Sequence, residues 1–306
     1  MSHMDFASYR VLLKALGDSA SLKAADALAS ASPDLRCADD EGVVTQELIE
    51  RGWLDGNVSI TPNGLEALEP YRARRAVLLA SGFGNRMLPI TARIPKPLVP
   101  VHGTRIIDTL LDALVAIDVT EICIVRGYLA EQFDQLLQKY PGIRFINNPI
   151  FDSTNNISSA TLAARGMRNA YVFESDLLLR QPDLLCRYQY CSNYLGVKVD
   201  ATQDWCFTCK DGRIMNLAKG GSDCYHMFGI SYWSLEDGER LESHLPEAFQ
   251  DDDWKQRFWD DVPCVRFNDS YDLRIRPCSF DDIQEIDTFA ELQQADPLYL
   301  GEGGNA

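Results

Sequence analysis

The residues best suited to chemistry are gathered in one loop, which directly follows a short apolar run at 76–80. Gly82 and Gly84 leave two positions without a side chain where the chain turns, so backbone N–H groups can approach an anionic ligand closely. Arg86 and Lys96 add two cationic groups, and a proline on either side of the lysine restricts its backbone. These residue types predict a loop that binds phosphate groups.

Two common phosphate-binding motifs do not fit this loop. The dinucleotide-binding fingerprint needs a third glycine at position 87, which is Met87. A Walker loop needs Gly-Lys-Ser or Gly-Lys-Thr after the glycines, and no such triplet follows. The two glycines, Arg86 and the proline-flanked Lys96 instead resemble the signature of the nucleotidyltransferases, which join a nucleoside triphosphate to a phosphorylated acceptor.

Segments further along the chain narrow this resemblance. In their order and spacing they are similar to the bacterial CTP:phosphocholine cytidylyltransferase family, which also includes 2-aminoethylphosphonate cytidylyltransferases, and the similarity spans about residues 74–296. The segments are Gly127–Phe133, Asn155–Ser159, Glu174–Asp176, Gly229–Trp233, Trp259–Pro263 and Glu285–Asp287.

The resemblance implies transfer of CMP from CTP to phosphocholine, which forms CDP-choline and releases pyrophosphate. The alternative acceptor is 2-aminoethylphosphonate. More distant alternatives are a sugar-1-phosphate nucleotidylyltransferase, which would share only the glycine loop, and a winged-helix transcriptional regulator. Arg86 and Lys96 are then expected to be catalytic, and CTP is the expected nucleotide partner. The expected nucleotide-binding residues are Leu79, Ala80, Ser81, Gly82, Gly84, Gly127, Gln132, Asn156, Ser158 and Glu174.

Two carboxylates are candidates for a metal site. Asp176 follows the apolar run at 170–173, so we expect it at the carboxyl end of a strand, where open α/β sheets place their ligands. The family resemblance makes Asp287 the second carboxylate on a shared Mg²⁺, and oxygen ligands suit that cation.

The acceptor is expected to be a small phosphorylated or phosphonate amine. A trimethylammonium group favours aromatic faces because it cannot donate a hydrogen bond, whereas a primary amine favours carboxylates. The candidate acceptor-binding residues are Trp205, Tyr225, Tyr232, Trp259 and Asp260.

Short apolar runs alternate with helical patterns after residue 74, which predicts an α/β fold with a doubly wound, mixed but mostly parallel sheet. Strands are expected at 76–80, 121–125, 143–146 and 170–173. A helical pattern is expected over 283–295. We predict an N-terminal helical appendage at 4–72, the catalytic domain at 73–298 and a tail at 299–306. The glycine-rich end of the tail is typical of a linker, so a fused C-terminal enzyme module is considered.

The appendage has helices and a short strand at 58–60, an arrangement similar to a winged helix. Residues 5–70 contain 5 basic and 12 acidic side chains, and the whole chain carries a formal net charge of −16. Such charge opposes binding to nucleic acid or to an anionic membrane surface. We therefore expect no nucleic-acid or membrane partner and a packing or homodimerisation role for the appendage. The nine cysteines follow no regular framework and the N-terminus has no secretory signal pattern, which predicts a cytoplasmic location.

Overall fold

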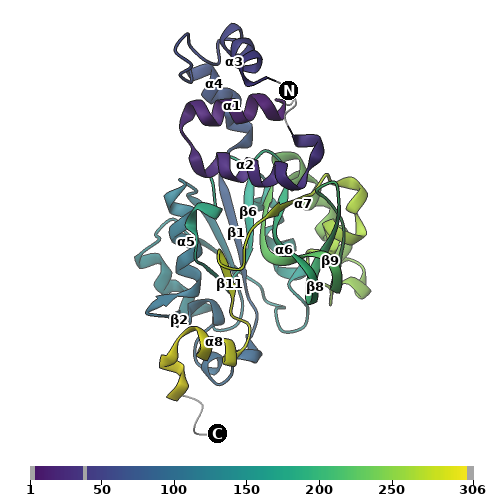
Figure 1. Cartoon of the computed structure of the whole chain (residues 1–306). Coiled ribbons are helices and arrows are strands. Elements are labelled where there is room, and N and C mark those ends of the chain that lie inside the picture. Colours follow the sequence, from purple (N-terminus) through teal and green to yellow (C-terminus); the bar gives the residue numbers. More distant parts are fainter. Residues whose placement is uncertain (1–3, 37–39, 302–306) are drawn as a thin grey trace.

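The computed structural model describes residues 4–36 and 40–301 and contains one seven-stranded sheet flanked by helices (Figure 1). The strand order is β10-β8-β9-β6-β1-β4-β5. β1 pairs in parallel with β4 and β6, β4 with β5, and β10 with β8, whereas β9 runs antiparallel to β6 and β8. The predicted α/β class is confirmed. The strands are β1 (Arg75–Ala80), β4 (Glu121–Arg126), β5 (Arg144–Asn147), β6 (Ala170–Glu174), β8 (Asn193–Lys210), β9 (Arg213–Trp233) and β10 (Arg274–Pro277).

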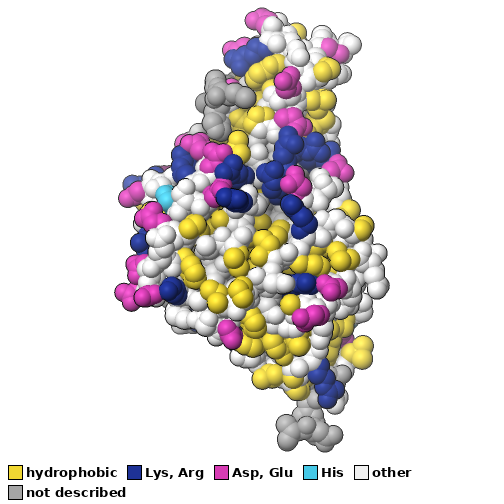
Figure 2. Space-filling model, turned by 180° about the vertical axis from the view of Figure 1, so that it is seen from behind, with side chains coloured by type: hydrophobic (Ala, Val, Ile, Leu, Met, Phe, Trp, Pro, Cys, Tyr) yellow, Lys and Arg dark blue, Asp and Glu magenta, His cyan; other side chains and the backbone are white. Residues whose placement is uncertain are grey.

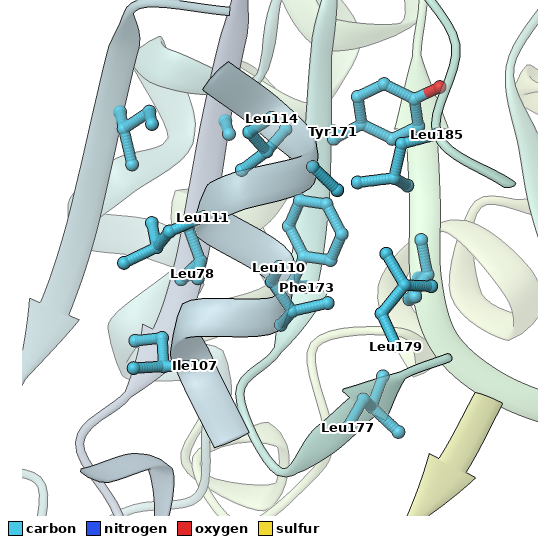
Figure 3. Packing of buried hydrophobic residues seen from close by; sticks show 14 of the residues in the cluster. Leu78, Ile107, Leu110, Leu111, Leu114, Tyr171, Phe173, Leu177, Leu179 and Leu185 are labelled. Carbon is cyan, nitrogen blue, oxygen red and sulfur yellow. The ribbon is translucent and has the colours of Figure 1, made fainter. Parts of the chain in front are cut away.

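The central strand β1 is buried on both faces, which explains why its sequence is apolar without alternation. Leu78 points into a core formed with helix α5 (Ile106–Ala116), where it meets Leu110 and Leu114. Phe173 from the neighbouring β6 joins the same core (Figure 3).

The opposite face of the sheet has its own core. Val77 and Leu79 of β1 pack there with helix α6 (Ile157–Ala163) and with helix α7 (Leu235–Phe249). Trp233 and Trp259 are fully buried in this second core. Burial of large apolar side chains on both faces contributes roughly 1.5–3 kcal/mol per side chain, so the sheet is a rigid platform for whatever lies at its edges.

Two smaller strand pairs complete the catalytic part. β2 (Pro100–Val101) pairs with β3 (Thr104–Arg105), and β7 (Leu177–Leu179) pairs antiparallel with β11 (Ile283–Glu285). The expectation of a helical pattern over 283–295 is therefore wrong at its start, because only α8 (Phe289–Ala295) is helical. Shorter helical segments are Pro33–Leu35, Glu69–Tyr71, Asn85–Met87, Ile90–Ala92, Lys96–Leu98, Ala130–Gln138, Ala164–Met167, Pro182–Leu184, Asp252–Trp254, Val262–Arg266, Asn268–Ser270 and Pro297–Gly301.

Four helices form the N-terminal part: α1 (Phe6–Leu16), α2 (Ser19–Ala31), α3 (Glu41–Glu50) and α4 (Pro62–Leu68). Between α3 and α4, a single antiparallel bridge joins Leu54 and Ile60 in place of the short strand expected there. On the face drawn in Figure 2, acidic and hydrophobic side chains are interspersed with the basic ones over these helices.

The N-terminal helices pack against the catalytic part. Both guanidinium NH groups of Arg274 donate to the Asp34 carboxylate at 2.9 Å, and the Tyr188 N–H donates to the Ser21 hydroxyl at 3.0 Å. The Tyr71 and Tyr190 rings stack with their centroids 5.7 Å apart. Figure 1 shows this bundle at one end of the sheet, with α8 at the other. Among residues 4–36 and 40–301, no helix has the length and apolar character needed to cross a membrane. Residues 302–306 of the predicted tail lie outside the described residues.

Gly238 provides a test of how tightly α7 packs. A glycine-to-alanine change inside a helix normally adds about 1 kcal/mol of stability. At Gly238, however, an added methyl group would lie 2.5 Å from the Met167 carbonyl oxygen and 2.6 Å from Arg168 Cα. We therefore expect Gly238→Ala to lower the free energy of unfolding by about 1–3 kcal/mol, measured by chemical denaturation. Gly56→Ala, where the methyl group meets nothing within 4 Å, is the control. Equal stability of the two variants would contradict the packing described.

Candidate active site

The glycine loop follows Ala80, the last residue of β1, at the carboxyl end of that strand. Gly84 has φ +66°, and an added Cβ there would lie 3.0 Å from Lys96 Cβ and 3.1 Å from Thr91 Cγ2. Both its backbone conformation and this close approach therefore favour glycine. The Thr91 hydroxyl donates to the Gly84 carbonyl at 2.9 Å, which closes the loop on itself. Gly82 faces open space, so its backbone stays accessible to a ligand.

Lys96 lies at the centre of a buried ionic cluster. Its Nζ donates to Asp176 Oδ2 at 2.8 Å and to Asp287 Oδ1 at 2.6 Å, and only 10% of its side chain is exposed. Arg86 donates to the same Asp287 oxygen at 2.8 Å, but its side chain is 68% exposed. The four residues named from the sequence as catalytic or metal-binding thus form one connected group.

The pairing of β7 with β11 brings Asp287 to Asp176. Asp176 precedes β7 and Asp287 follows β11, and the Ile286 N–H donates to the Asp176 carbonyl at 3.3 Å. The backbone of Asp287 is held further by Glu291, whose Oε2 accepts from the Asp287 and Thr288 N–H groups, each at 2.8 Å. Thr288, rather than Asp287, caps helix α8. The Asp287 side chain is therefore free to face the lysine.

A third carboxylate, Glu285, joins the cluster. Single oxygens of Asp176, Glu285 and Asp287 lie within 4.8 Å of one another. The second Asp176 oxygen, Oδ1, is buried and has no hydrogen-bond partner within the described part of the chain. Three oxygen donors, one of them unpartnered, fit a hard divalent cation such as Mg²⁺ better than a soft metal.

The cluster shifts the pKa values of its members. Burial lowers the pKa of Lys96, but the Asp176 and Asp287 carboxylates outweigh it, and the net effect is a raised pKa. Burial, together with the Asp176 and Asp287 charges, raises the pKa of Glu285 to about 9. Burial and the carboxylates of Asp176 and Asp260 likewise raise the pKa of Glu174. The lysine therefore stays charged, while the crowded glutamates are protonated more easily than usual.

The larger of two adjoining cavities at this site, called the main cavity below, opens between the glycine loop and the strand ends and has a volume of about 260 Å³. It is lined by both cations, Arg86 and Lys96, and by Asp176. Seven of the ten predicted nucleotide-binding residues also line it: Leu79, Ala80, Ser81, Gly82, Gly84, Asn156 and Glu174. The Asn156 side-chain amide donates to Glu174 Oε1 at 3.1 Å, and Asn156 Oδ1 accepts from the backbone N–H of Trp259 at 2.8 Å. Asn156 thus fixes one wall.

The other three predicted nucleotide-binding residues lie behind the lining. Gly127 lies under the Phe151 ring, where an added Cβ would come within 2.5 Å of the ring carbon Cγ. The Gln132 amide donates to the Arg93 carbonyl at 2.9 Å. The buried Ser158 hydroxyl accepts from the Asn148 amide at 2.8 Å. In this structure these residues shape the loops around the cavity, and Phe151 is the lining residue that Gly127 positions.

A second cavity of about 50 Å³ adjoins the first and shares Glu174 and Phe258 with it. Its lining contains four carboxylates, contributed by Glu174, Asp204, Asp260 and Glu285. The Trp205 and Phe258 rings meet edge to face with their centroids 5.3 Å apart. Leu217, Met227 and Gly229 complete the lining. This combination of acidic side chains and ring surface can accommodate a small organic cation.

Two of the five predicted acceptor residues, Trp205 and Asp260, line this second cavity. Tyr232 and Trp259 are buried in the two cores of the sheet, and the Tyr225 ring lies 5.0 Å from the Lys198 ammonium. In this structure these three aromatic residues pack, as most aromatic side chains do.

Sequence reasoning missed Asp204, Glu285 and Phe258 as lining residues. Glu285 stands two residues before Asp287, and Asp204 stands directly before Trp205, so their neighbours were signals that could have identified them. Gly229 gave an indirect signal, because an added Cβ there would lie 2.6 Å from Glu174 Cγ. The glycine leaves room for a carboxylate that both cavities use.

Comparisons with known proteins agree with this geometry. A model described as nucleotidyl transferase matches residues 75–191. The 2-aminoethylphosphonate cytidylyltransferase of Lancefieldella rimae is 38% identical over 229 residues, which cover 74% of this chain and 93% of that relative. The chain belongs to the cytidylyltransferase family of nucleotidyltransferases.

Other family members are similar over nearly the same length of this chain. The choline-phosphate cytidylyltransferase of Streptococcus pneumoniae is 28% identical over 233 residues, covering 74% of this chain and 99% of that relative. The solved structure of the CTP:phosphocholine cytidylyltransferase from the same species aligns with a TM-score of 0.67 at 27% identity, over 74% of this chain and 99% of that one. The family resemblance expected from the motifs is thereby confirmed.

The acidic cluster makes the stability of this cytidylyltransferase family member depend on pH. The pKa of Glu285 rises from its ordinary 4.5 to about 9, and that of Asp260 rises from 3.8 to about 7. The folded chain therefore binds protons that the unfolded chain has released, and stability falls as the pH rises through this interval. We expect Glu285→Gln to lose less stability than wild type as the pH rises, because an amide carries no charge.

Thermal melts of chelator-treated protein at several pH values between 5 and 9 measure this. Glu66→Gln, at an exposed position on α4, is the matched control and should keep the wild-type slope. Parallel slopes for wild type and Glu285→Gln would refute the prediction.

Proposed function

We propose that this chain is a CTP-dependent cytidylyltransferase whose acceptor is a small phosphonate or phosphate ester bearing an amine, with 2-aminoethylphosphonate the preferred acceptor. The observation that carries the proposal is the pair of adjoining cavities. One is lined by the glycine loop and two cations, and the other is lined by four carboxylates. Such a pair suits an anionic triphosphate next to an acceptor with a cationic end.

The proposed reaction requires that the acceptor be positioned against CTP and that the developing negative charge be stabilised. An oxygen of the acceptor's phosphonate attacks the α-phosphorus of CTP, a new P–O bond forms, and the bond from the α-phosphorus to the bridging oxygen breaks as pyrophosphate leaves. The attacking oxygen is already anionic, so no general base is needed. Lys96 and Arg86 stabilise the negative charge that develops on the transferring and leaving groups.

Mg²⁺ is the metal that we propose for the cluster of Asp176, Glu285 and Asp287. When bound, it supplies Lewis-acid stabilisation of the phosphate oxygens. The support is the oxygen-only donor set and the unpartnered Asp176 Oδ1. The carboxylates of the chain also keep Lys96 in place at the floor of the cavity.

The second cavity supports a primary amine over a quaternary one. An ammonium group can donate hydrogen bonds to carboxylates, and four carboxylates surround a cavity that has only two aromatic rings. The similarity to the Lancefieldella rimae enzyme, named for 2-aminoethylphosphonate, favours the same acceptor. The Trp205 and Phe258 rings and the similarity to the choline-phosphate enzymes favour phosphocholine as the second candidate.

A competition assay between the two acceptors tests the proposal. With CTP and Mg²⁺ present, we expect faster CMP transfer to 2-aminoethylphosphonate than to phosphocholine, followed as pyrophosphate release and as the identity of the CMP product. Glucose 1-phosphate is the control for a sugar-1-phosphate enzyme. A preference for phosphocholine would reverse the assignment of the acceptor. The absence of transfer to either acceptor would refute the proposed function.

Asp204 offers a test of how one carboxylate of the second cavity contributes to binding of the acceptor. Asp204→Asn removes one charge from the second cavity, and loss of one charged hydrogen bond of about 1.4 kcal/mol raises the KM for 2-aminoethylphosphonate about tenfold. The KM for CTP should stay unchanged. Asp200→Asn, an exposed carboxylate on the same strand and outside the lining, is the matched control. Equal KM values in the two variants would show that Asp204 does not contact the acceptor.

Lys96 is expected to act on kcat. Lys96→Ala should lower kcat about 10²- to 10³-fold, because the variant loses a cation at the developing charge. Arg93→Ala, an exposed cation three residues upstream and outside the lining, should retain wild-type kcat. Steady-state kinetics with both variants measure the difference, and a fall confined to the KM for CTP would contradict a transition-state role.

A further inference from the structure

The ammonium of Lys96 lies on the oxygens that a divalent cation would need. Its Nζ is 2.8 Å from Asp176 Oδ2 and 2.6 Å from Asp287 Oδ1, and both residues belong to the three-carboxylate cluster. Mg²⁺ takes oxygen ligands at about 2.0–2.1 Å and nearly octahedral geometry, so an ammonium and a metal ion that share these oxygens repel each other at close range. Binding of one cation therefore opposes binding of the other.

The surroundings of Lys96 hold the ammonium in this place. Nine-tenths of the side chain is buried, and its stem packs against Gly84, where an added Cβ would lie 3.0 Å from Lys96 Cβ and 3.7 Å from Lys96 Cδ. Pro95 and Pro97 restrict the backbone on both sides. The charged end of the lysine is consequently the part that can move, and Lys96 lines the main cavity.

That cavity gives an incoming anion access to the ammonium, because Lys96 lines it together with Arg86 and the glycine loop, which provide a second cation and hydrogen-bond donors. The rest of its polar lining includes Glu174, whose raised pKa favours the neutral form, and the uncharged side chains of Ser81 and Asn155, which are weaker partners than an anion. A buried ammonium without an anionic partner is costly. A metal ion arriving alone would supply no such partner, whereas a triphosphate in the cavity would give the ammonium new anionic oxygens.

We infer that Lys96 makes metal binding conditional on nucleotide: its ammonium occupies the carboxylates of Asp176 and Asp287 until the triphosphate draws it away. The inference rests on the proposed function for the identity of the nucleotide. It adds a role for Lys96 before any chemistry, as a resident counterion that keeps the cluster closed to free metal. By linkage, metal and nucleotide must then raise each other's affinity by the same factor.

The experiment measures binding of Mn²⁺ alone by electron paramagnetic resonance, with no nucleotide, acceptor or turnover. Lys96→Met keeps the length of the stem and removes the charge, and Lys96→Gln replaces the ammonium by an uncharged amide on a shorter stem. We expect each to bind Mn²⁺ at least about tenfold more tightly than wild type, a change that corresponds to 1.4 kcal/mol. In wild type, adding CTP should restore tight Mn²⁺ binding.

Arg93→Met is the matched control, because Arg93 is an exposed cation three residues before Lys96 and lies outside the cavity lining. It leaves Lys96 in place, so its affinity for Mn²⁺ alone should stay near that of wild type. Circular dichroism of each variant before titration establishes that it is folded.

A second measurement uses the wild-type chain only. Mg²⁺ alone should leave its melting temperature nearly unchanged, while Mg²⁺ with CTP should raise it by more than CTP does in chelator. Tight binding of Mn²⁺ to nucleotide-free wild type, equal to that of the lysine variants, would overturn the inference. Failure of the acceptor assignment would appear in the competition assay and would leave these binding results untouched.

Discussion

A buried ion pair network around Lys96 connects all the parts of the proposed site. The lysine belongs to the loop after β1, Asp176 follows β6, and Asp287 follows β11. Each partner compensates a charge that would be costly if buried alone, and removal of Lys96 would take away the ammonium that Asp176 and Asp287 share. The network therefore fixes the position of three distant segments, and both cavities open beside it.

The sheet supports this network without contributing reactive groups from its interior. Two apolar cores hold β1 between helices, and Ser81 and Asp176 follow where β1 and β6 end. The N-terminal helices pack at the opposite end, through Arg274, Tyr188 and the stacked Tyr71 and Tyr190 rings. This placement is consistent with a structural contribution that leaves the cavities untouched.

Basic side chains gather at the main cavity, and acidic side chains gather at the second cavity. With a formal net charge of −16, the chain has few cations to spare for a triphosphate, and it concentrates Arg86, Lys96 and the glycine loop at the main cavity. The acidic surplus reappears in the second cavity as four carboxylates. Glu174 and Phe258 line both, so the two cavities share a wall. An anionic donor and a cationic acceptor group can thus be held next to each other.

Local patterns in the amino-acid sequence were enough to predict the apolar strands, the glycine loop, its two cations and Asp176, because each depends on neighbours close along the chain. The resemblance to the family added Asp287. The contact of Asp287 with Lys96, the strand at 283–285 and the membership of Glu285 and Asp204 depended on the pairing of β7 with β11 and on the course of β8. Residues 283–285 have a helical pattern and form a strand because a partner strand far away in the sequence supplies the hydrogen bonds. Tertiary contacts outweigh weak local preference, and they alone bring carboxylates from separate segments to within one ion's reach.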